Sequence, residues 1–125
     1  MAKTKKPDSG KKLVSAAIKG LQEKKGREIA SLDLRNLKNA VTDYFVVCHA
    51  ASRTNVLSLA AAAEEAIHKA TGESPWHREG FENAEWVLLD YVNMVVHIFL
   101  EDARTFYGIE RLWADADIKK AAGAY

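Results

Sequence analysis

Two apolar strands separated by only two residues constrain the fold of this chain more than any other feature of its sequence. The segments run from Trp86 to Tyr91 and from Met94 to Leu100, and Val92-Asn93 between them has the length of a tight hairpin loop. Pairing outward from this loop sets residue 91 opposite residue 94 and residue 87 opposite residue 98. Because successive side chains of a strand point to opposite faces, the register divides the hairpin into two different surfaces.

One predicted surface is wholly apolar and the other is chemically mixed. Helices are expected to cover the apolar surface, which consists of Val87, Leu89, Tyr91, Met94, Val96 and Ile98. The second surface, called the mixed face below, consists of Trp86, Leu88, Asp90, Val95, His97 and Phe99. Aromatic residues beside polar ones are typical of interface centres, so the mixed face is predicted to bind a partner. The alternative is that a third layer or a second copy of the chain covers it, with Asp90 and His97 bonded to each other.

The remaining periodicities predict an α/β domain. Helical spacing of apolar residues runs from Leu13 to Leu21, and a long amphipathic helix follows the capping residue Ser52. Two strands lie between these helices, one around residues 29–34 and one at residues 44–48 that is apolar on both faces and therefore central. A short helix is expected from Glu101 to Tyr107. The order α-β-β-α-β-β-α predicts a mixed sheet with helices packed on one face.

The chain is expected to form one domain over residues 11–116, with a flexible lysine-rich tail at residues 1–10 and a C-terminal tail at residues 117–125. Five lysines fall in the first dozen residues, namely Lys3, Lys5, Lys6, Lys11 and Lys12. These lysines are expected to form a solvated tail; the alternative is that they attract phosphates loosely. Four outlying aromatic residues could extend the mixed face or close the ends of the core: Trp76, Tyr107, Trp113 and Tyr125.

Charge and cysteine usage narrow the class of protein. A formal net charge of +1 argues against a nucleic-acid binder that uses its whole surface. The single cysteine, Cys48, lies within an apolar run, which predicts a packed thiol and a reducing compartment, and we expect a cytoplasmic protein. No apolar stretch approaches the roughly 18 residues of a membrane span, so no membrane partner is expected.

The sequence lacks the usual signatures of catalysis. A metal pair for nucleotidyl transfer needs clustered carboxylates, whereas Asp33, Asp43 and Asp90 each stand alone on or near the predicted strands. The histidines show no metal-ligand spacing, and no glycine-rich phosphate loop precedes a long helix. Ser52 ahead of its helix could hold an anion, but capping explains the same residue. We therefore predict no catalytic residue, no metal, no cofactor and no enzymatic activity.

Several strings together resemble the ribosomal silencing factor family, also called Iojap. They occur in the family's order and with its gaps, at Thr42 to Cys48, Glu79-Gly80, Trp86 to Tyr91, Val95 to Phe99 and Glu110 to Trp113. The resemblance spans about residues 11–116. It implies a nucleotidyltransferase-like fold that lacks the catalytic carboxylates.

The resemblance also implies a function. Members of the family bind the large ribosomal subunit at its subunit-joining face, through the ribosomal protein numbered fourteen, and sterically block the small subunit. The implied role is repression of translation when nutrients are scarce, without a cofactor. Alternatives are a role in assembly of the large subunit or a nucleotidyltransferase-like enzyme. Secondary contact with ribosomal RNA and a homodimer off the ribosome are further partners to consider.

The resemblance assigns residues as well. The family's strand tryptophan matches Trp86, the acid and aromatic that end this strand match Asp90 and Tyr91, and the histidine of the last strand matches His97. With the mixed face, this gives a predicted partner-binding set of Trp86, Leu88, Asp90, Tyr91, His97, Phe99 and Tyr107. The chain departs from the family at Val92-Asn93, where Gly-Asp is usual, and at Ala50, where glycine is usual.

Overall fold

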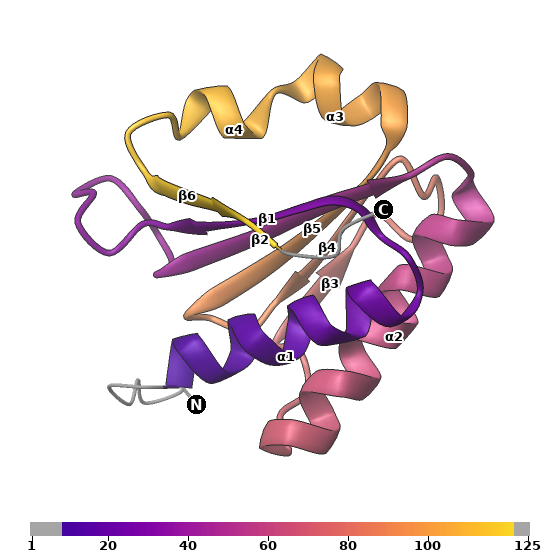
Figure 1. Ribbon diagram of the computed structural model, residues 1–125, viewed down its shortest axis with the longest axis horizontal. Helices are drawn as coiled ribbons and strands as arrows, with labels where there is room; N and C mark the ends of the chain where they lie inside the picture. The colour runs from indigo at the N-terminus through magenta and orange to yellow at the C-terminus, as the bar shows by residue number, and fades with distance from the viewer. Residues whose placement is uncertain (1–8, 122–125) are drawn as a thin grey trace.

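A computed structural model describes residues 9–121 as a six-stranded sheet with helices on both faces (Figure 1). The helices are α1 (Ser9–Glu23), α2 (Arg53–Thr71), α3 (Glu101–Tyr107) and α4 (Ile109–Leu112). The strands are β1 (Arg27–Asp33), β2 (Tyr44–Ala50), β3 (His77–Glu79), β4 (Trp86–Asp90), β5 (Met94–Leu100) and β6 (Asp117–Lys120).

The sheet is mixed, as predicted. Its spatial order is β3-β4-β5-β2-β1-β6, with β2 and β5 parallel and the other neighbours antiparallel. The central place of β2 explains its apolar sequence, since every residue of this strand except His49 is buried. The prediction of a central strand at residues 44–48 is confirmed.

The hairpin register is also confirmed. Val87 pairs with Ile98, Leu89 pairs with Val96, and the Tyr91 N–H donates to the carbonyl of Met94 at 2.8 Å. Val92 turns the chain with φ +75°, a conformation that is costly for a β-branched residue. The turn is held from both sides: the Val92 N–H donates to Asp90 Oδ1 at 2.8 Å, and Thr42 Oγ1 donates to the Val92 carbonyl at 3.0 Å.

Helices α1 and α2 cover the apolar face of the hairpin, as predicted (Figure 1). The two helices approach closely because α1 carries Gly20, where a Cβ would lie only 2.6 Å from the Ala62 carbonyl oxygen. Helix α2 begins where expected, since Ser52 Oγ accepts the Asn55 N–H at 3.2 Å. It ends at Gly72, whose φ of +76° suits a left-handed cap.

The prediction that helices pack on one face only is wrong. Helices α3 and α4 cross the opposite face, where a second apolar cluster forms (Figure 1). The buried members of that cluster are Leu32, Leu34, Phe45, Val47, Val95, Phe99 and Ile109. The mixed face is therefore covered in part by a third layer, which was the alternative considered from the sequence.

Three short elements depart from the predicted order. Strands β3 and β6 form the two edges of the sheet, and the four-residue helix α4 follows α3 after Gly108. Strand β6 pairs with β1 inside the predicted C-terminal tail, while α1 begins at Ser9, whose Oγ accepts a hydrogen bond from Asn93 Nδ2 at 2.6 Å. The described helices and strands thus extend beyond residues 11–116 at both ends. Residues 1–8, with the first lysines, and residues 122–125, with Tyr125, lie outside the described residues.

Cys48 is a packed thiol, as predicted. Its side chain is fully buried in the cluster under α1 and α2, and burial raises the pKa of the thiol to about 12. His49 points to the other face of the sheet, toward α3, so the adjacent pair cannot act as nucleophile and base. Within residues 9–121, no helix has both the length and the apolar character needed to cross a bilayer.

Candidate partner-binding surface

Trp86 is the centre of an aromatic group on the mixed face. It extends from β4, half-buried, and its Nε1–H donates to Nδ1 of His97 at 3.0 Å. Its ring lies 5.0 Å from that of Phe99 and 4.8 Å from that of Tyr107, measured between centroids. These contacts, from β5 and α3, hold the tryptophan ring in place within the folded domain.

His97 is a structural partner of Trp86 and carries no charge at neutral pH. Its side chain is only 5% exposed, and burial lowers the pKa of the imidazole to about 3. The ring meets Phe45 edge-on at 4.5 Å, and Nε2 has no hydrogen-bond partner among the described residues. Because Nδ1 accepts the tryptophan N–H, the neutral imidazole carries its proton on Nε2.

This burial predicts a pH dependence of stability. The unfolded imidazole binds a proton near pH 6.5 and the folded one only near pH 3, so stabilisation is complete above pH 6.5 and is lost progressively as the pH falls toward 3. We expect the free energy of unfolding of the wild type to fall by about 2 kcal/mol from pH 7 to pH 5. Urea titrations should show that His97→Gln removes most of this change. His49→Gln is the control. The pKa of His49 is also lowered, by burial and by Arg104, so this variant measures how much of the pH dependence comes from the other buried histidine. An unchanged pH dependence in His97→Gln would contradict the assignment.

The predicted binding residues divide into accessible and inaccessible groups. Leu88 and Asp90 are partly exposed with Trp86, and Tyr107 is 43% exposed. Phe99 is fully buried beneath Trp86, so with His97 it supports the surface from below. Asp90 does not bond His97; its Oδ1 accepts the Val92 N–H instead.

Tyr91 does not lie on this surface. Its side chain is fully buried in the cluster under α1 and α2, where burial raises the pKa of its hydroxyl. The inclusion of Tyr91 in the predicted contact set therefore conflicts with its position, and its role is packing of the opposite face. The conflict follows from the register itself, since residue 91 alternates with Asp90.

A hollow of about 360 Å³ lies beside Trp86. It is lined by Glu79, Gly80, Trp86 and Leu88, at the edge of the sheet where β3 pairs with β4. Only glycine fits at position 80, because φ is +86° and a Cβ would lie 1.9 Å from the Trp86 carbonyl oxygen. The hollow therefore adjoins the aromatic group around Trp86.

Helices α3 and α4 add apolar surface that the sequence reading missed. Phe106 is 78% exposed and contacts Tyr107 edge-on at 5.1 Å, and Leu112 is 76% exposed. Trp113 is half-buried against Phe45, with ring centroids 5.9 Å apart. Their exposure depends on how α3 and α4 pack on the sheet, so no local sequence pattern could have identified Phe106 and Leu112.

Arg104 fixes this helical layer to the sheet. Its guanidinium donates to both carboxylate oxygens of Glu110, at 2.9 and 3.0 Å, and to the carbonyl of Glu28 at 2.8 Å. The same group lies 2.9 Å from His49 Nδ1, and the side chain is 11% exposed. One arginine thus joins α3, α4, β1 and β2.

The acidic residues and histidines of the described chain do not form a metal cluster. Among residues 9–121, no three histidine, cysteine or acidic side chains gather closely enough to hold a metal ion. Asp33, the last residue of β1, forms an ion pair with Arg35 in which Arg35 Nη2 lies 2.6 Å from Asp33 Oδ2. This arginine lowers the pKa of the Asp33 carboxyl. The fold is thus an α/β domain with a six-stranded mixed sheet and an aromatic group centred on Trp86 on one of its faces.

Comparison with known proteins identifies its kind. The family model described as "Ribosomal silencing factor during starvation" matches residues 7–123, and the chain belongs to this family. Its members are regulatory proteins and not enzymes, in agreement with the prediction made from the sequence.

Individual relatives resemble the chain along nearly its whole length. A ribosomal silencing factor of Halalkalibacterium halodurans is 30% identical over 92% of this chain and 97% of its own. One of Bacillus subtilis is 33% identical over 86% and 90% of the respective chains. A crystal structure of a Chromobacterium violaceum protein has a TM-score of 0.78 and 32% identity, covering 91% of this chain and 93% of that one.

Proposed function

We propose that this protein represses translation by binding the large ribosomal subunit at its subunit-joining face and excluding the small subunit. The observation that carries the proposal is the pre-formed surface around Trp86, where Leu88, Tyr107, Phe106 and the adjoining hollow are accessible on a rigid support. Membership of the ribosomal silencing factor family supplies the class of partner. The ribosomal protein numbered fourteen is the proposed contact.

A steric repressor requires affinity and bulk but no chemistry. Preformed aromatic anchors provide affinity because little conformational entropy is lost when they dock. The folded domain provides the bulk. The proposed scaffold is a nucleotidyltransferase-like fold without its carboxylates, acting in the cytoplasm when nutrients are scarce.

Assembly of the large subunit is the second candidate function. It uses the same surface and the same partner, and it differs in when the protein binds. A second copy of the chain on this surface would compete with the ribosome for the same anchors.

Sedimentation of a cell lysate tests the proposal. We expect the protein to travel with free large subunits at low magnesium and to be depleted from assembled ribosomes at high magnesium. Presence mainly on immature large-subunit particles would favour the assembly role. Sedimentation with neither subunits nor precursors would contradict both.

A further inference from the structure

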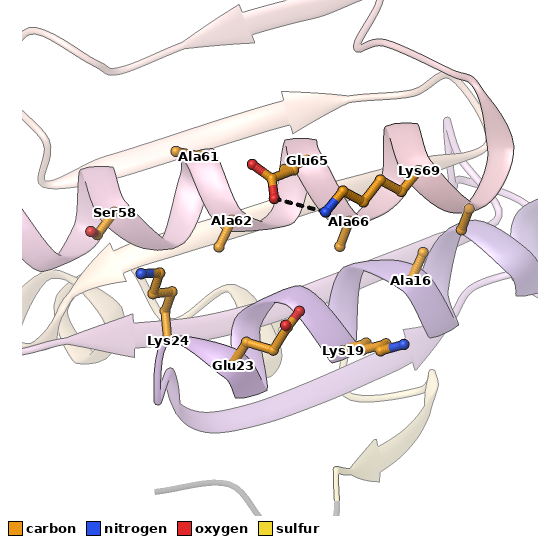
Figure 2. Close-up of a pocket in the computed structure, with 11 residues that line it drawn as sticks. Ala16, Lys19, Glu23, Lys24, Ser58, Ala61, Ala62, Glu65, Ala66 and Lys69 are labelled. Atoms are coloured by element: carbon orange, nitrogen blue, oxygen red, sulfur yellow. Dashed lines mark ion pairs between the residues drawn. The ribbon is translucent and has the colours of Figure 1, made fainter.

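The two long helices enclose a groove on the side of the molecule away from the mixed face (Figure 2). One hollow, of about 650 Å³, is lined by residues of α1, of α2 and of the turn after α1. A second, of about 520 Å³, adjoins it and shares Ala16, Lys19 and Ala70 with it. The groove therefore continues from the beginning of α1 to its end.

The rim of the groove is predominantly cationic. The second hollow is lined by Lys11, Lys12 and Lys19 with Ser15, and by no carboxylate. The first hollow adds Lys24 and Lys69 together with Glu23 and Glu65. Figure 2 shows Lys24 reaching toward Ser58 across the groove, and Glu65 paired with Lys69 at 3.3 Å. Five lysines against two glutamates leave three net positive charges along one line.

The floor and the lining chemistry indicate what kind of anion fits. The floor consists of alanines, so a chain can approach the helices without meeting large side chains: Ala16, Ala61, Ala62, Ala66 and Ala70. The groove has no aromatic ring on which bases could stack and no arginine for paired hydrogen bonds to a base. Its apolar lining residues are all alanines, whereas a groove that binds a peptide helix presents larger apolar side chains. Lysines along such a channel suit evenly spaced phosphates.

We propose that this groove, centred on Lys11, Lys12 and Lys19, binds the phosphodiester backbone of single-stranded RNA without reading its sequence. The proposal deepens the ribosomal role and rests on it for the source of the RNA. The surface formed by Trp86, Leu88, Phe106, Tyr107 and the hollow beside Trp86 is called the docking surface below. Because α1 and α2 cover the sheet face opposite to Trp86, the RNA contact and the docking surface do not compete (Figure 1). The RNA contact would add a salt-sensitive component to subunit binding.

The test uses the full chain and a labelled uridine 12-mer, with fluorescence anisotropy measured between 50 and 200 mM salt. The variant combines Lys11→Gln, Lys12→Gln and Lys19→Gln. The matched control combines Lys38→Gln, Lys119→Gln and Lys120→Gln, which removes the same charge from exposed positions outside the groove. The slope of log K against log salt should become shallower by about 2 in the groove variant, since each lost phosphate contact contributes about 0.7, and should change little in the control.

Equal changes in the two variants would show that only total charge matters and would overturn the proposal. A labelled glutamate 12-mer forms the second arm: loss of its binding in the groove variant, with unchanged RNA binding, would assign the groove to an acidic peptide and also overturn the proposal. Thermal melting confirms that both variants fold.

Leu88→Glu separates the two sites, because this variant should no longer bind large subunits but should still bind the uridine 12-mer. Failure of the groove test therefore leaves the proposed docking surface standing, and the reverse also holds.

Discussion

Replacing Trp86 with alanine should weaken binding to the large ribosomal subunit by about 30-fold to 1000-fold, equivalent to about 2 to 4 kcal/mol. The loss is expected because Trp86 lines the hollow on the docking surface and its ring contacts the exposed Tyr107. The variant should also lose stability, since His97 Nδ1 is left buried without its donor, at a cost of about 1 to 3 kcal/mol. Titration of labelled protein with purified large subunits measures the first effect, and urea unfolding measures the second.

Two further variants separate binding from folding. Leu88→Glu leaves the Trp86–His97 bond in place and sets a carboxylate in the docking surface, so it should abolish binding while the domain remains folded. Leu57→Ala truncates an exposed residue of α2, the helix that packs on the opposite face of the sheet, and should bind normally. A folded Trp86→Ala protein with wild-type affinity would exclude this surface. If Trp76→Ala lost binding instead, the contact would lie beside the edge strand β3, where that 63% exposed tryptophan stands.

Replacing Arg104 with alanine should destabilise the domain by about 3 kcal/mol. The change leaves the Glu110 carboxylate, the Glu28 carbonyl and His49 without their common donor. Breaking a buried ion pair costs about 3 to 5 kcal/mol. We take the lower end of this range because the Glu110 side chain is one-third exposed. Because Arg104 joins α3 and α4 to the sheet, hydrogen exchange should accelerate most in residues 101–113. Large-subunit binding should weaken as Tyr107 loses its fixed position.

Arg53 provides the matched control. It also donates to a carboxylate and a backbone carbonyl, at 2.9 Å to Glu85 and 2.9 Å to Asn83, but its side chain is 59% exposed. Arg53→Ala should therefore cost no more than about 1 kcal/mol. Equal losses for the two arginines, or exchange that accelerates uniformly across the sheet, would contradict the role assigned to Arg104.

The main elements could be predicted from the sequence because each has a strong local pattern. The hairpin and the capped helix α2 carry apolar periodicities of a strand and of a helix, and β2 is a short apolar run of strand length rich in aromatic and β-branched residues. The edge strands could not be predicted in this way. Strand β3 is His-Arg-Glu and β6 is Asp-Ile-Lys-Lys. Charged residues keep edge strands of this kind from pairing with other chains, and the same residues make the strands resemble loops in the sequence.

The composition of the mixed face was predictable, but its coverage was not. Alternation correctly placed Trp86, Leu88 and Asp90 on one face, whereas the burial of His97 and Phe99 depends on where α3 and α4 pack. That packing depends on Arg104, whose partners lie 76 and 55 residues away at Glu28 and His49. No local pattern reveals contacts across such separations. Tyr91 was assigned by resemblance alone, and the alternation of the strand already opposed that assignment.

The proposed function requires that the surface around Trp86 exclude the small subunit from the large one. It is tested most directly by light scattering of purified subunits after magnesium is raised, with the protein added at increasing concentration. Wild-type protein should suppress the rise in scattering in proportion to its occupancy of large subunits, and Leu88→Glu should have no effect at the same concentrations. Normal subunit joining on large subunits saturated with wild-type protein would contradict the account.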